Sequence, residues 1–110
     1  LHDINKSIDY LQKASQDEFL DAHILLGHIY YKGLEIPRNV EKAILYLKHA
    51  SSLNDSNAKN NIGVIYKIGD EVEKNLENAL IYFNESIKLN NDLVTSFNFI
   101  HTKFFGKKII

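Results

Sequence analysis

The chain has 110 residues, a formal net charge of -1 and no cysteine. This length fits one domain or a piece of a longer array, and the near-zero charge gives no electrostatic footprint for nucleic acid or an anionic membrane. The lack of cysteine excludes disulfide scaffolds, thiolate metal sites and cysteine nucleophiles.

The chain contains a repeat of 36 residues. Laying residues 21–56 over 57–92 without a gap gives identical residues at 12 of the 36 positions. A period of this length is typical of helical hairpins that stack in an array. Because the chain begins at Leu1 and contains no methionine, we expect it to be a fragment of a longer array.

The repeat divides the chain into four parts. Residues 1–20 are predicted as the second helix of a partial repeat, because Tyr10 falls on Tyr46. Residues 21–56 and 57–92 are two full repeats. Residues 93–110 are a degenerate first half, either a cap or a packing surface for a repeat that has been removed. The predicted fold class is all-α, with antiparallel helix hairpins.

Each full repeat is predicted to contain two helices. In the first helix the apolar residues recur at spacings of three and four, which indicates one buried stripe. Gly33 and Gly69 are expected to end this helix, because glycine accepts the left-handed conformation. Asn39 and Asn75 are expected to cap the second helix, and Asn54 and Asn90 to end it in the left-handed conformation. The stripes are Ala22, Leu26, Ile29 and Tyr30, then Val40, Ala43, Ile44, Leu47 and Ala50.

Two glycines lie in the middle of the first helices, at Gly27 and Gly63. Glycine there costs roughly 0.5–1 kcal/mol relative to alanine, which indicates that no side chain fits. We expect Ala43 and Ala79 in the following helices to be the close partners, so that Gly-x-x-Tyr-x-x-Gly serves packing rather than chemistry.

This pattern resembles the Sel-one-like repeat, a tetratricopeptide-related helical hairpin. The resemblance covers essentially the whole chain, and it departs at Glu35 and Glu71, where the family usually has a second glycine. It implies an α-α superhelix, or solenoid, that serves as a non-catalytic protein-binding scaffold. Family members are associated with assembling membrane-bound, signalling and degradation complexes.

The sequence contains no recognisable catalytic or metal-binding motif. His23 and His28, five residues apart on a helix, point roughly 140° away from each other and cannot share a metal; we interpret them as surface histidines. No phosphate-cradling loop or nucleophile elbow occurs. We expect no enzyme activity, cofactor or metal. The apolar stretch 97–110 is too short and too polar for a membrane span.

Three N-x-S sequons occur, at Asn5, Asn54 and Asn84. The favoured interpretation is that they occur by chance in an Asn-rich surface and have no function. In the lumen of the endoplasmic reticulum they would be glycosylation candidates. They point toward the secretory pathway, with a cytoplasmic location left open.

A candidate partner-binding face follows from the resemblance, since in related repeats the first helix of each hairpin lines the groove. Its residues lie off the packing stripe and differ between the two copies, as a recognition surface requires. Unconstrained surface is the alternative. The candidates are Asp21, Ile24, Leu25, His28, Tyr31 and Lys32 in one repeat and Asn57, Asn60, Asn61, Val64, Lys67 and Ile68 in the next.

Three functions are compatible with these features. The main hypothesis is an adaptor that binds a peptide or protein and helps to hold a complex together. The second is self-association, as a homodimer, through the apolar residues of 93–110. The third is a regulatory domain of a larger enzyme. The apolar residues are Phe97, Phe99, Phe104, Phe105, Ile109 and Ile110.

Overall fold

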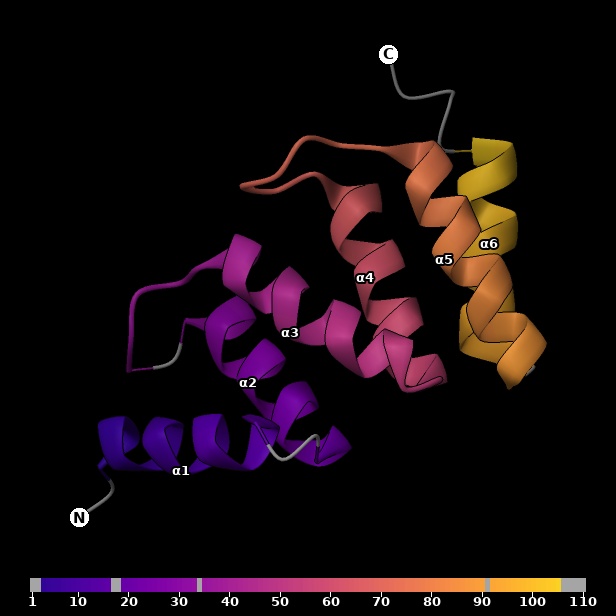
Figure 1. Ribbon diagram of the computed structural model, residues 1–110. Helices are drawn as coiled ribbons and strands as arrows, with labels where there is room; N and C mark the ends of the chain where they lie inside the picture. The colour runs from indigo at the N-terminus through magenta and orange to yellow at the C-terminus, as the bar shows by residue number, and fades with distance from the viewer. Residues whose placement is uncertain (1–2, 17–18, 34, 91, 106–110) are drawn as a thin grey trace. The chain divides into compact units, whose positions relative to one another are not determined.

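The computed structural model describes residues 3–16, 19–33, 35–90 and 92–105. Within these residues it contains six α-helices and no strand (Figure 1), which confirms the predicted all-α class. The chain divides into two compact units, the first ending at Leu53 and the second beginning at Asn54. The helices are α1 (Ile4–Gln16), α2 (Leu20–Lys32), α3 (Val40–Ser52), α4 (Ser56–Ile68), α5 (Leu76–Leu89) and α6 (Leu93–Phe105).

The first unit is built around α2, which packs against both α1 and α3. Each helix contributes to one apolar cluster, and fully burying an aliphatic side chain contributes roughly 1.5–3 kcal/mol. Tyr30 and Tyr46 stack with ring centroids 5.9 Å apart and planes 5° from parallel. The buried members of the cluster are Ile8, Leu26, Tyr30 and Ala43.

In the second unit α5 packs against both α4 and α6. Phe83 of α5 and Ile62 of α4 are fully buried. The buried hydroxyl of Ser86 donates a hydrogen bond to the carbonyl of Ser56 at 2.8 Å. The repeated tyrosine pair is present again, with the rings of Tyr66 and Tyr82 6.1 Å apart. The two hairpins α2–α3 and α4–α5 therefore share the same internal packing.

The predicted helix caps of the second helices are confirmed. The side chain of Asn39 accepts a hydrogen bond from the backbone N–H of Lys42 at 3.0 Å, and that of Asn75 accepts one from Asn78 at 2.9 Å. Each such cap is worth about 1 kcal/mol, because it satisfies a free N–H of the first turn.

The predicted helix ends are confirmed at three positions and wrong at one. Gly33 and Gly69 follow α2 and α4 with φ of 67° and 71°, in the left-handed conformation. Asn54, after α3, has φ of 64°. Asn90, after α5, is instead extended, with φ of -152°.

The extended Asn90 marks a change of register before α6. The side chain of Asp55 caps α4 at Ala58, and that of Asp92 caps α6 at Thr95, each at 2.7 Å. The two aspartates are 37 residues apart, one more than the repeat length. Thr95 is buried, as is Ala58. The chain therefore has one extra residue between α5 and α6. Each residue of α6 lies 37 positions after its equivalent in α4, instead of 36. Gly106, 37 residues after Gly69 in the sequence, lies outside the described residues.

The close helix approach at the two mid-helix glycines is present, but the expected partners were wrong. A Cβ at Gly27 would lie 2.9 Å from Cγ of Leu47, and one at Gly63 would lie 2.5 Å from the ring of Phe83. The nearest atom of Ala43 to the same Gly27 position is its carbonyl oxygen, at 3.6 Å. The glycines make room for a large side chain of the next helix, rather than for a small one.

Candidate functional site

The six candidate residues of the first unit lie on α2. Asp21, Leu25, His28 and Lys32 are exposed and recur at helical spacing, so they form one outward stripe. Ile24 and Tyr31 are half-buried at its edge. The stripe has the apolar Leu25 near its centre, the acidic Asp21 at one end and the basic Lys32 at the other.

Tyr31 is held in place by the loop that follows α2. The Nε of Arg38 donates a hydrogen bond to the Tyr31 carbonyl at 2.8 Å, and the guanidinium carbon lies 4.8 Å from the centre of the Tyr31 ring. A cation over the face of an aromatic ring is attracted by the ring quadrupole. Tyr31 is therefore a fixed edge of the stripe rather than a free side chain.

The six candidate residues of the second unit lie on α4, and α6 contacts two of them. The side-chain amide of Asn98 donates to Oδ1 of Asn60 at 3.2 Å. The ammonium group of Lys67 donates to Nδ1 of His101 at 2.9 Å, since lysine has no acceptor. Asn57 and Ile68 are exposed, and Asn61 and Val64 are half-buried.

Burial lowers the pKa of Lys67 below its usual value of 10.5. His101 is in turn stacked between two aromatic rings of its own helix, with centroids 5.6 Å from Phe97 and 5.3 Å from Phe105. The Lys67–His101 contact therefore joins α4 to an aromatic row on α6.

An open hollow lies beside Asn57 and Asn60, with a volume of about 450 Å³. Its lining contains side-chain amides from α4, the carboxylate of Asp92 that caps α6, and apolar side chains from the first turn of α6. Sequence reasoning missed the α6 side of this surface, because residues 93–110 were interpreted only as a cap or a packing surface for a further repeat. The lining residues are Asn57, Asn60, Asp92, Leu93, Val94 and Thr95.

The histidine prediction was wrong for His23. His23 is buried, and its ring lies 3.9 Å from the ring of His49 on α3. In the second unit the equivalent positions, 36 residues later, are occupied by Lys59 and Glu85, whose charged groups are 3.2 Å apart. The same pair of positions thus joins the helices of each hairpin with different chemistry. His28 is exposed, as expected.

No group of three or more histidine, cysteine or acidic residues that could hold a metal ion occurs among the described residues. In the same residues, no helix combines the length and the apolarity needed to cross a membrane.

The comparisons with known proteins agree with this geometry. The model of the Sel1 repeat matches residues 1–18, 20–55 and 56–91. The chain belongs to the Sel1 repeat family. A solved structure, described as the crystal structure of a Sel1 repeat protein from Oxalobacter formigenes, has a TM-score of 0.79 and 27% sequence identity. No curated protein sequence matches the chain.

The similarity to that Sel1 repeat structure covers 88% of this chain and 39% of the other. It confirms the expected fold class, an α-solenoid of antiparallel helix hairpins. The present chain spans about two-fifths of the length of that Sel1 repeat protein, by the same coverage of 39%.

Proposed function

We propose that the chain is a non-catalytic protein-interaction module that binds peptide or protein segments on the outward stripe of α2 and on that of α4, each taken by itself. Membership of the Sel1 repeat family supports the protein-binding class. The observation that carries the proposal is the contrast within each hairpin. The packing residues are repeated, whereas the exposed residues of the first helices differ between the two copies.

The chemistry of the two stripes suggests what they bind. On α2, the exposed Leu25 offers an apolar contact between charged ends. On α4, Asn57 and Asn61 offer amide groups that can donate to and accept from a peptide backbone. We therefore expect the α2 stripe to bind a segment with an apolar anchor, and the α4 stripe to bind a segment with unpaired backbone or polar groups.

A matched pair of leucines tests this proposal. Leu25, on the proposed stripe of α2, is 50% exposed, and Leu45, on the outer face of α3, is 67% exposed. Peptides selected from a displayed random library against the wild-type chain are expected to lose binding to Leu25→Asp and keep it with Leu45→Asp. Thermal unfolding of both variants controls for the fold. Equal retention of the peptides by both variants would contradict the proposed surface.

Self-association through α6 is a second candidate function. Six large apolar side chains on this helix are at least half exposed, led by Leu93 at 88%, and apolar patches of this kind mark association sites. Light scattering across a concentration series is expected to show a dimer that Phe97→Asp converts to a monomer. A wild-type chain that stays monomeric at high concentration would remove this candidate. The side chains are Leu93, Val94, Phe97, Ile100, Phe104 and Phe105.

The predicted tail residues Ile109 and Ile110 lie outside the described residues. The three sequons favour a luminal location, and a regulatory domain of a larger enzyme is the third candidate function.

A further inference from the structure

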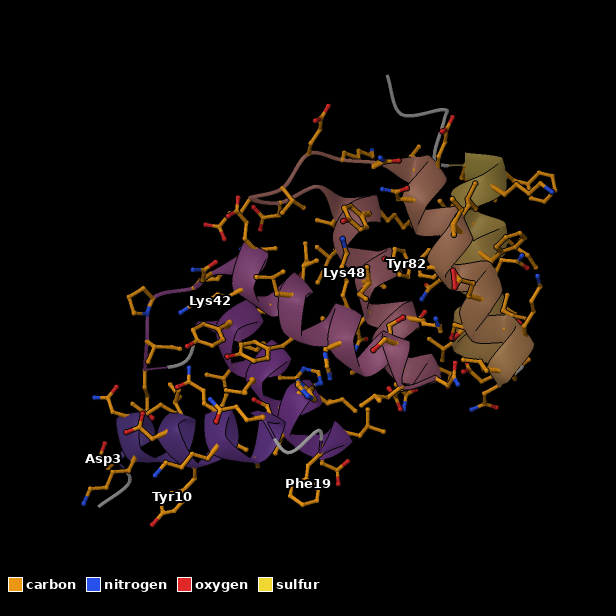
Figure 2. All side chains as sticks on the ribbon, viewed as in Figure 1. Asp3, Tyr10, Phe19, Lys42, Lys48 and Tyr82 are labelled. Atoms are coloured by element: carbon orange, nitrogen blue, oxygen red, sulfur yellow. The ribbon has the colours of Figure 1, made fainter. Side chains whose placement is uncertain are left out.

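The last turn of α4 brings a lysine against a histidine of α6. Tyr66 stacks on Tyr82, which projects from α5 toward α4 (Figure 2). The next residue, Lys67, is turned by about 100° around the helix. Its ammonium group lies 2.9 Å from Nδ1 of His101. Because α4 and α6 belong to the same compact unit, packing inside that unit sets this contact.

The surroundings of Lys67 favour the neutral form of its amine. Among the described residues, no carboxylate lies within ion-pair distance of its nitrogen, whose polar partner is the imidazole of His101. By contrast Lys59, two turns earlier on α4, has the Glu85 carboxylate at 3.2 Å. A carboxylate stabilises an ammonium group, whereas burial destabilises it. The pKa of Lys67 is therefore below its usual value of 10.5, and more of its nitrogen is nucleophilic near neutral pH than in an exposed lysine.

The His101 ring is held in one orientation by aromatic residues of its own helix. Its centroid lies 5.6 Å from that of Phe97 and 5.3 Å from that of Phe105, one turn to either side. Because a lysine ammonium group can only donate, the Nδ1 atom that it contacts is the unprotonated nitrogen of a neutral ring. Lys67 is thus an amine with a proton acceptor fixed beside it, the arrangement that activates a lysine nucleophile.

The first unit has no lysine at the equivalent position. Tyr31 lies 36 residues before Lys67, and its carbonyl accepts a hydrogen bond from Arg38. The next residue, Lys32, is exposed in the last turn of α2. Since the dipole of the helix acts on both lysines at the same end, Lys32 is a matched reference for the reactivity of Lys67.

We propose that Lys67 is a site of covalent acylation by an acyl thioester. The neutral amine of Lys67 forms a bond to the thioester carbonyl carbon, the carbon–sulfur bond breaks, and the sulfur leaves as a thiolate. The proton that the nitrogen loses passes to Nδ1 of His101 and then through solvent to the thiolate. The products are an amide and a thiol, and the chain loses one positive charge from the α4 stripe.

Competitive labelling of the wild-type chain tests the proposal. The folded chain is treated with a limiting amount of S-acetyl-N-acetylcysteamine, a small neutral thioester, and is then denatured and fully acetylated with deuterated acetic anhydride. Mass spectrometry gives the extent of the first reaction at each lysine. At about pH 7.5 we expect Lys67 to react about threefold faster than Lys32, because each unit by which a pKa is lowered raises the neutral fraction about tenfold and this outweighs the lower nucleophilicity. The ratio is expected to fall as the pH rises toward 10.5, since Lys32 then becomes neutral as well.

Two comparisons separate the proton acceptor from burial alone. Lys59 is buried on the same helix but is paired with Glu85, and we expect it to react more slowly than Lys32. His101→Phe continues the aromatic row of α6 without a ring nitrogen and is expected to remove the excess reactivity of Lys67. Thermal unfolding checks the fold of this variant, and the pH profile of the wild type decides even if the variant does not fold.

The proposal is overturned if Lys67 reacts no faster than Lys32 in the folded wild-type chain, or if their ratio stays constant as the pH rises. It is also overturned if the excess persists in folded His101→Phe. Since the labelling involves no peptide, these results are independent of those for Leu25→Asp.

Discussion

Gly63 has no room for a side chain in the second hairpin. Its missing side chain leaves space for the Phe83 ring, which a Cβ would approach to 2.5 Å. Phe83 is fully buried in its turn. The ring cannot move aside without leaving the core, so the helix crossing depends on this one position.

We expect Gly63→Ala to lower the free energy of unfolding by about 1–3 kcal/mol, because overpacking outweighs the higher helix propensity of alanine. Adding Phe83→Leu, which recreates the pair of Gly27 and Leu47, is expected to recover part of the loss. Denaturant unfolding of the two single variants and the double variant measures the coupling. Strictly additive losses would show that the two residues do not compete for the same space.

Glu71 lies in the loop between α4 and α5 with φ of 60°. This left-handed conformation is strained for a residue with a side chain. We expect Glu71→Gly to raise the free energy of unfolding by about 0.5–1 kcal/mol. Glu73→Gly, in the same loop but without positive φ, is the control and is expected to be neutral or destabilising. A gain of equal size from both substitutions would argue against relief of strain.

At the scale of single helices, Lys59 and Glu85 join α4 to α5. Lys59 is 9% exposed, whereas Glu85 is half-buried. We expect Glu85→Leu to cost about 1 kcal/mol, because it removes the carboxylate 3.2 Å from the Lys59 ammonium. The double variant Lys59→Met with Glu85→Leu is expected to return close to wild-type stability, since apolar packing replaces a charge pair without loss. Urea unfolding of the three variants checks the order.

The contact between α4 and α6 makes stability depend on pH. Because the pKa of Lys67 is below 10.5 in the folded chain, the unfolded chain binds more protons between the two pKa values. The contribution of Lys67 to the free energy of unfolding therefore rises with pH between its folded-state and unfolded-state pKa values. We expect wild type to gain stability relative to Lys67→Gln as the pH rises toward the usual lysine pKa of 10.5. A constant difference between the two proteins would contradict the burial of Lys67.

The sequence predicted those elements of the fold that depend on local residues. Caps at Asn39 and Asn75 and ends at Gly33 and Gly69 need only the residues beside them. The partner of Gly27 was not predictable in this way, because the choice between Ala43 and Leu47 depends on the rotation of α3 about its axis.

For the candidate site, the sequence predicted which side chains are exposed better than it predicted which residues of other helices they contact. Leu25 and His28 are exposed as the repeat pattern indicated. The contacts of Asn60 and Lys67 with α6 were missed, because the candidate face was defined from the first helices of the two full repeats alone. The burial of His23 was missed because the spacing of His23 and His28 on one helix does not show that α3 places His49 against His23.

At the scale of the whole molecule, the division into two units predicts how the chain loses structure. Residues 1–53 and 54–110 form separate compact units, and repeat proteins gain stability from each repeat and its nearest neighbours. We expect Gly63→Leu to raise amide hydrogen exchange in α4–α6 more than in α1–α3. Exchange that rises equally in all six helices would indicate a single cooperative unit instead.

The extra residue before α6 also decides how this chain can be lengthened. New hairpins grafted after Asn54, where the left-handed asparagine is followed by a capping aspartate, would inherit the spacing that α4 uses. Grafted after Asn90, they would follow an extended asparagine instead, so the first new helix would leave the junction in a direction different from that of α4. A longer array of these hairpins would therefore use the junction at Asn54 and not the one at Asn90.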